Sequence, residues 1–175
     1  MKKTILKFLA IGMIVGISNT LAAQTNTASA SSSAFATIVA PIGLSHSGAD
    51  LQFGTMIKGT GTVTVSTADV RTFSNSALNP GDQGATPTAA VFTVTGEGSY
   101  TYSIAFTNET ETLTNTGSQT MVAGNFVALS SDGEGLTGTL SNGSDTVKVG
   151  ATLTLDDDET AGTYTGSFEV TVAYN

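Results

Sequence analysis

The sequence has 175 residues, the length of one domain with a short processing segment. Charged residues make up 11% and hydrophobic residues 39%, and the chain has one His and neither Cys nor Trp. This composition supports a folded core and excludes disulfides, Cys-ligated metal centres and thiol nucleophiles. A single His also removes most histidine-based metal sites. We therefore expect a protein without a cofactor and without enzymatic activity.

The first 23 residues have the three-part pattern of a secretory signal peptide. Lys2, Lys3 and Lys7 form a basic start, and residues 8–17 are an apolar run too short to span a bilayer. Ala22 and Ala23 then provide small residues for cleavage. The pattern predicts export of the protein, cleavage near Ala23, and no integral membrane segment in the mature chain.

Cleavage changes the net charge of the protein. Three basic residues, Lys58, Arg71 and Lys148, remain against 14 acidic ones, so a mature chain of 152 residues carries 3 − 14 = −11. Nucleic acids and anionic lipid surfaces require clustered Lys and Arg, so we expect neither as a partner.

Most of the mature chain shows a hydrophobic period of two. Residues 24–33 are uncharged and predict a flexible Thr/Ser/Ala leader, and residues 34–175 predict a single domain. In the clearest strand, Tyr100, Tyr102, Ile104 and Phe106 alternate with small or polar residues. The other strands are expected at residues 62–65, 91–95, 126–129, 136–140, 146–155 and 163–174.

Turn signals recur between these runs. The pair Asn142-Gly143 is the strongest short-range hairpin signal in the chain. No long window has apolar residues at helical spacing. We therefore predict an all-β, immunoglobulin-like or pilin-like antiparallel sandwich with Greek-key connections.

Motifs for catalysis are weak. His46 lies in the sequence LSHSG, but abundant serines make a match to a serine–histidine pair uninformative, and no G-x-S-x-G motif is present. We expect His46 to occupy a turn. Tyr100 and Tyr102 could form a platform for stacking a sugar, although alternating aromatic residues in a strand more often pack in the core.

Asp156, Asp157, Asp158 and Glu159 form the densest charge cluster and are a weak candidate for calcium, which binds six to eight oxygens. The spacing differs from that of an EF-hand loop, and consecutive residues of an extended segment point to opposite faces. The alternative is a solvated hairpin tip, which we favour.

Both ends of the mature chain suggest strand exchange. Phe168, Val170, Val172 and Tyr174 alternate with more polar residues up to the end of the sequence. Near the start, an expected strand has alternating apolar residues at Ala36, Ile38, Ala40, Ile42 and Leu44. An apolar strand joined to a domain by little chain can pair within its own domain or with a neighbour.

The last fourteen residues resemble the C-terminal motif of chaperone–usher (fimbrial) pilin subunits. That motif has a penultimate aromatic residue, here Tyr174, preceded by alternating apolar residues, and a glycine fourteenth from the end, here Gly162. The resemblance implies an incomplete sandwich that the N-terminal extension of the next subunit completes, here the segment at residues 34–44.

The whole mature chain is similar to a family of secreted bacterial proteins, domain of unknown function 4402. The segments that carry this resemblance are LQFG at 51–54, GTVTV at 61–65, AVFTVTG at 90–96, VGATL at 149–153 and AGTY at 161–164. The family implies a sandwich fold and export from a bacterium, to the periplasm, the outer surface or the medium. It implies no activity.

Three functions remain open at this point. The leading hypothesis is an exported structural or cell-surface protein, a fimbrial-type subunit that associates with itself or with other surface subunits by β-strand exchange. The alternative is a monomeric secreted module that binds carbohydrate or a surface through loops. A secreted hydrolase is the least favoured hypothesis.

Overall fold

The structure is a computed structural model, and it describes residues 26–133 and 135–175. The predicted signal peptide at residues 1–23 lies outside the described residues. The chain divides into two units, residues 1–37 and residues 38–175. Within the first unit, described residues 26–37 form neither helix nor strand. The second unit contains all of the strands in the described part of the chain.

The described residues contain no α-helix and form two antiparallel sheets, so the predicted all-β fold is confirmed. The strands are short except for two long central ones, β7 (Thr120–Ser130) and β9 (Ser144–Leu155). The others are β1 (Gly43–His46), β2 (Gly61–Val65), β3 (Arg71–Phe73), β4 (Ala90–Thr95), β5 (Thr101–Phe106), β6 (Thr110–Thr114), β8 (Thr137–Thr139) and β10 (Val170–Tyr174), with a single 3₁₀ turn, η1 (Ser76–Leu78).

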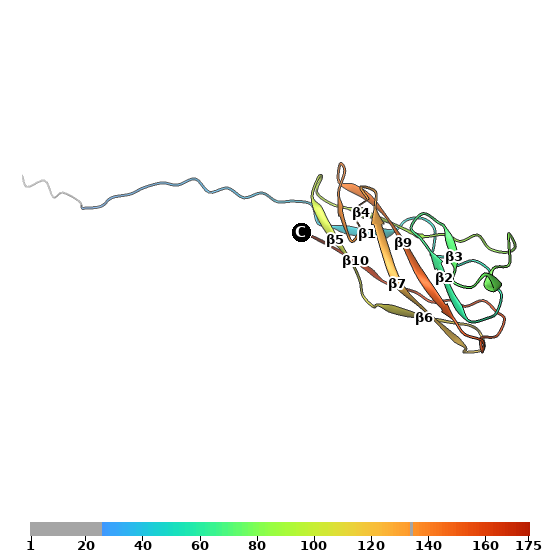
Figure 1. The fold of residues 1–175 in the computed structure, drawn as a ribbon. Coiled ribbons are helices and arrows are strands. Elements are labelled where there is room, and N and C mark those ends of the chain that lie inside the picture. Colours follow the sequence, from blue (N-terminus) through green and yellow to red (C-terminus); the bar gives the residue numbers. More distant parts are fainter. Residues whose placement is uncertain (1–25, 134) are drawn as a thin grey trace, which may run out of the picture. The chain divides into compact units, whose positions relative to one another are not determined.

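The larger sheet is organised around β9. One edge of β9 pairs with β7, and β6 lies outside β7. The other edge is shared by two strands placed end to end, because β4 pairs with residues 144–149 and β2 with residues 151–155. β1 then pairs with β4, and β3 with β2 (Figure 1).

The smaller sheet has the order β10-β5-β8. The chain crosses between the two sheets at β4–β5, β5–β6, β7–β8, β8–β9 and β9–β10, so neighbours in a sheet are often distant in sequence. β10 is an edge strand of the smaller sheet, because β5 pairs with one side of it and, among the described residues, no strand pairs with the other.

The core has two parts, one on each half of the larger sheet. The first lies between the two sheets and contains Tyr102, Ile104, Val147 and Val149. The second lies under β2, β7 and the C-terminal half of β9, where the smaller sheet does not reach. Phe53, from a loop, and Leu78, from η1, also belong to this second part. The alternating inward residues of β9 belong to both parts, as expected for a central strand with one buried face.

Two predicted strands are shorter in the structure. At the start, only Gly43 and Leu44 of the strand expected in residues 34–44 lie in β1, which runs on to His46 and begins after Pro41, a residue that cannot donate a ladder hydrogen bond. At the end, the strand expected over residues 163–174 is confined to Val170–Tyr174. Upstream of it, Thr165 forms an isolated bridge with Thr114, so this segment follows β6 before it reaches the smaller sheet.

The Asn142-Gly143 turn is confirmed. Both residues have positive φ, 52° and 81°, as a two-residue type I′ turn requires. Ser141 and Ser144 exchange two backbone hydrogen bonds across the turn, at 2.9 and 3.2 Å. The turn therefore carries the chain from the smaller sheet into β9.

Candidate functional site

The outer edge of β10 presents a row of backbone groups away from β5. The Asn175 N–H donates to the Thr101 carbonyl and the Thr107 N–H donates to the Glu169 carbonyl, so odd-numbered residues form the hydrogen-bonded pairs with β5. Pairing alternates along an antiparallel ladder, so the N–H and C=O groups of Val170, Val172 and Tyr174 point outward. This edge can accept another strand.

The segment before β1 is attached to this edge through a tyrosine hydroxyl. The Tyr174 hydroxyl donates to the Ala40 carbonyl at 2.9 Å and accepts from the Glu97 N–H at 2.6 Å. The Glu97 carboxylate accepts from the Ala40 N–H at 3.0 Å. Both backbone groups of Ala40 are therefore bound within its own domain. The sequence singled out Tyr174 and Ala40 but gave no sign of Glu97.

The side of the sandwich between β1 and β10 is filled by the protein's own aromatic rings. Phe168 stacks on Phe126 with ring centroids 5.1 Å apart and meets the edge of Phe92 at 6.0 Å. Val172 and Tyr174 also pack against this part of the core. A strand added at the outer edge of β10 would extend the smaller sheet by backbone hydrogen bonding.

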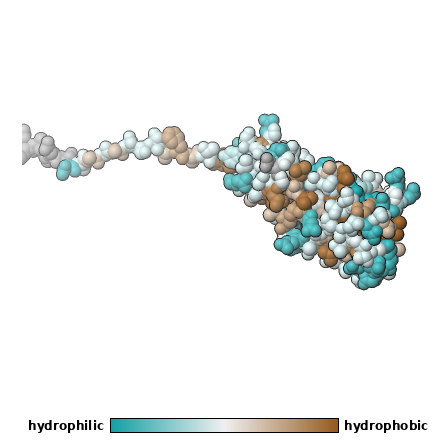
Figure 2. Space-filling view, viewed as in Figure 1, coloured by the Kyte–Doolittle hydropathy of each residue, from teal (hydrophilic) through white to brown (hydrophobic). Residues whose placement is uncertain are grey.

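The structure separates the residues predicted for the donor strand into two groups. Ile42 and Leu44 are half-buried and pack against the core of their own domain. Ala36, Ile38 and Ala40 are exposed, and Ile38 is 97% exposed. Figure 2 shows apolar side chains along the segment that precedes β1, described from residue 26 onward, and Phe35 in this segment is 92% exposed. Gly162, predicted from the same motif, is exposed in the loop between β9 and β10.

His46 lies at the end of β1 on the protein surface. Its Nε2 atom lies 3.1 Å from the Ala49 carbonyl oxygen and 3.6 Å from Asp50 Oδ1. The neighbouring Ser45 and Ser47 hydroxyls bond instead to Thr93. No serine–histidine hydrogen bond forms among residues 26–133 and 135–175, so the structure brings together no catalytic triad there.

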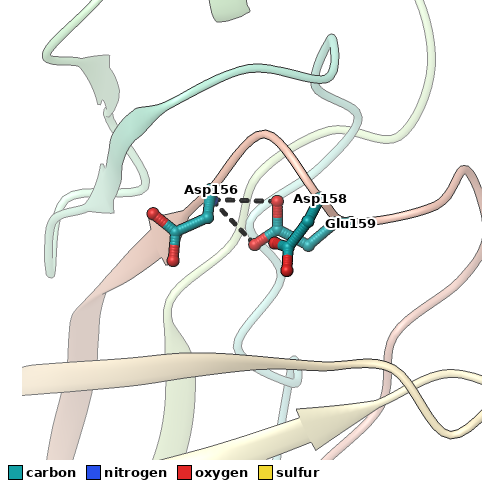
Figure 3. A group of neighbouring side chains, drawn as sticks. All are labelled: Asp156, Asp158 and Glu159. Carbon is teal, nitrogen blue, oxygen red and sulfur yellow. Dashed lines mark hydrogen bonds between the residues drawn. The ribbon is translucent and has the colours of Figure 1, made fainter.

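The acidic loop follows β9 and brings three of its four carboxylates together. Asp156, Asp158 and Glu159 each offer an oxygen within 4.8 Å of the others, whereas Asp157 is not part of the group (Figure 3). Both Glu159 oxygens accept from the Asp156 N–H, at 2.8 and 2.9 Å. This contact closes a tight turn at the loop tip. Hydrophilic side chains gather at this end of the domain in Figure 2.

Tyr102 is fully buried, so it presents no face for stacking a sugar. Its hydroxyl donates to Asp145 Oδ2 at 2.6 Å, and Asp145 also accepts from the Thr146 N–H at 2.7 Å and from the Ser131 hydroxyl. Burial, followed by the hydrogen bond to Asp145, raises the pKa of Tyr102 above its usual value of 10.0. Tyr100 is 42% exposed and packs edge-on against Tyr174.

A surface concavity that the sequence did not indicate lies at the free edge of β3, where Arg71 is held by loop carbonyls. Its recognition from sequence would have required knowledge of the loops that fold against β3. No helix in the described part of the chain has the length and apolar character needed to cross a bilayer.

The geometry defines an all-β sandwich with an exposed edge strand and without a catalytic triad in its described residues. The chain belongs to the family described as domain of unknown function (DUF4402), whose model matches residues 42–174. The resemblance stated from the sequence is thus confirmed. A search of curated proteins gave no match.

Proposed function

We propose that the mature chain is an exported, non-catalytic structural protein of a bacterial surface that associates by β-strand addition. The acceptor is the outer edge of β10, and the donor is the segment at residues 34–39 of a second copy, which is exposed at residues 34–38 and half-buried at Val39. The observation that carries the proposal is the outward row of backbone groups at Val170, Val172 and Tyr174.

The chemistry of the donor segment supports this assignment. Ile38 and Phe35 are the two most exposed of the large hydrophobic side chains in the described residues. Covering exposed apolar surface stabilises an association by ~25 cal/mol per Å², so these two side chains are the main apolar anchors. Ala36 adds little area. Ala40 is bound to Glu97 and Tyr174, so the free donor ends at Val39.

The acceptor edge has few features that block pairing. Natural edge strands are protected by inward charges, proline or bulges, and β10 has the sequence VTVAY with none of these. Glu169 precedes the strand and is bonded to Thr107. Strand addition supplies affinity through main-chain hydrogen bonds, so it requires no ligand pocket at this edge.

The test compares three versions of the mature chain, residues 24–175, by light scattering after size-exclusion chromatography. The wild-type chain is expected to form concentration-dependent oligomers. Ile38→Ser removes the main anchor and is expected to give monomers, whereas the matched control Thr37→Ser leaves that anchor in place and is expected to assemble. A wild-type chain that stays monomeric at high concentration overturns the proposal and favours the monomeric binding module.

A further inference from the structure

A concavity of about 580 Å³ lies at the free edge of β3, on the half of the larger sheet that the smaller sheet leaves uncovered. The concavity is an open surface hollow rather than an enclosed cavity. Strand, turn and loop residues line it, among them Arg71, Phe73, Ser76, Asn79 and Asp82.

Arg71 is oriented before any ligand arrives. Its Nη1 atom donates to the Phe53 carbonyl at 3.1 Å and to the Thr55 carbonyl at 2.9 Å. The guanidinium carbon lies 4.8 Å from the centre of the Phe73 ring. Only one nitrogen of the guanidinium and one face of its plane are used in these contacts, so its other N–H groups can bind a ligand. Because the Arg71 side chain is already held in place, it loses little conformational entropy when a ligand binds.

The loops around Arg71 fit together only because two positions are glycine. At Gly54, φ is +78° and an added Cβ would lie 2.4 Å from Arg71 Nη1. At Gly84, φ is +90° and an added Cβ would lie 2.0 Å from Thr55 Oγ1. The Ala85 N–H also donates to Thr55 Oγ1 at 3.1 Å, which joins the two loops. The concavity is therefore a defined arrangement of two loops against β3.

The edge of β3 adds backbone groups to the same concavity. Just after β3, the Ser74 N–H donates to the Thr62 carbonyl of β2. Hydrogen-bonded positions alternate along an antiparallel pair, so Ser74 and Thr72 direct their backbone groups toward β2, and the residues of β3 that alternate with them direct theirs away from it. These residues are Arg71 and Phe73, both of which line the concavity. Their free N–H and C=O groups can pair with hydroxyl groups.

The charge of Arg71 is not balanced by a carboxylate contact. The ion pairs formed within residues 26–133 and 135–175 are Lys148–Asp69 and His46–Asp50, and Arg71 takes part in neither. An arginine fork in a concavity matches a ligand carboxylate. Asp82 also lines the concavity, and its carboxylate accepts hydrogen bonds. It therefore favours a ligand whose hydroxyl groups donate hydrogen bonds.

The geometry points to a binding site for a hexuronate, a hydroxylated sugar ring that carries a carboxylate. Arg71 binds the carboxylate, and Asp82, Asn79, Ser76 and the backbone groups of β3 bind the ring hydroxyls. This site lies on β3 and is independent of strand addition at β10.

The test is a titration of the mature chain with galacturonate, followed by amide chemical shifts. Saturating shifts are expected at residues 71–73 and 79–82. Galactose, which lacks the carboxylate, and acetate, which lacks the ring, are expected to cause much smaller shifts at the same concentrations. The inference is overturned if galacturonate causes no shifts, or if either control ligand binds as well.

Two variants separate binding from folding. Asp82→Ala is expected to weaken galacturonate binding about tenfold, the usual effect of losing one charged hydrogen bond. The matched control Glu109→Ala changes the net charge equally at an exposed site on a distant loop, and it is expected to bind as wild type does. Equal affinities for the two variants overturn the assignment. Removing residues 24–39, which include the donor segment at residues 34–39, is expected to leave binding intact, whatever the outcome for assembly.

Discussion

The hydroxyl group of Tyr174 lies 2.9 Å from the carbonyl oxygen of Ala40, 134 positions earlier in the chain. The contact joins the edge strand of the smaller sheet to the segment that leads into β1. The same hydroxyl accepts from Glu97, so a single oxygen links three parts of the domain. Gly96 leaves room for it, because a Cβ there would lie 2.2 Å from the Tyr174 oxygen.

Replacing Tyr174 with Phe is expected to lower the free energy of unfolding by about 1–3 kcal/mol, because the half-buried Glu97 N–H loses its partner. Urea denaturation measures the loss, and amide exchange at Glu97 locates it. Tyr100→Phe is the matched control, since the Tyr100 ring packs against Tyr174 from an exposed position. Equal destabilisation by both variants would show that the hydroxyl contact is unimportant.

The raised pKa of Tyr102 predicts a loss of stability in alkali. The unfolded chain ionises near the usual tyrosine pKa of 10.0, whereas in the folded state burial and Asp145 favour the neutral phenol. The resulting stabilisation is fully present below that pH and decreases as the pH rises above it, because only the unfolded chain then releases the proton.

Urea midpoints measured from about pH 9 to about pH 11 test this expectation, because this range spans the ordinary ionisation of tyrosine. The wild-type protein is expected to lose stability more steeply than Tyr102→Phe, which has no phenol at this position. Parallel curves for the two proteins would contradict the prediction.

The Asn142-Gly143 turn predicts a position-specific effect of alanine. Gly143→Ala is expected to destabilise the domain by about 1–2 kcal/mol, the usual penalty for an L-residue with positive φ. The added Cβ would also lie 2.8 Å from the Gly96 carbonyl oxygen. Gly98→Ala, whose Cβ would have its nearest neighbour at 3.6 Å, is the control. Chemical denaturation of both variants measures the difference, and similar losses would argue against a special role for the turn.

Sequence pattern predicted β5 and β9 well because each has one buried and one exposed face, whereas only residues 126–129 of β7 were expected. β5 and β9 alternate strictly, and this pattern is visible without knowledge of their neighbours. β3 and β6 were missed for the opposite reason. β3 has three residues including Arg71, and β6 reads TETLT, so neither strand has a clear apolar face. Both owe their pairing to the neighbouring strand rather than to their own composition.

The candidate sites were less predictable than the strands. Alternation identified Tyr174, but its partners Glu97 and Ala40 are 77 and 134 residues away, and the sequence contains no signal for such pairs. The concavity at Arg71 depends on two loops that meet through Gly54 and Gly84. Glycine is common in this chain, so these two positions stand out only once the fold is known.

The acidic loop after β9 predicts no stabilisation by calcium. Calcium binds six to eight oxygens, whereas the cluster brings together three ligand oxygens, one from each of three carboxylates. An ion that binds only the folded state raises its stability, so the expected result is an unchanged melting temperature with millimolar calcium relative to chelator. A rise that calcium causes and magnesium does not, and that Asp158→Asn abolishes, would contradict this prediction.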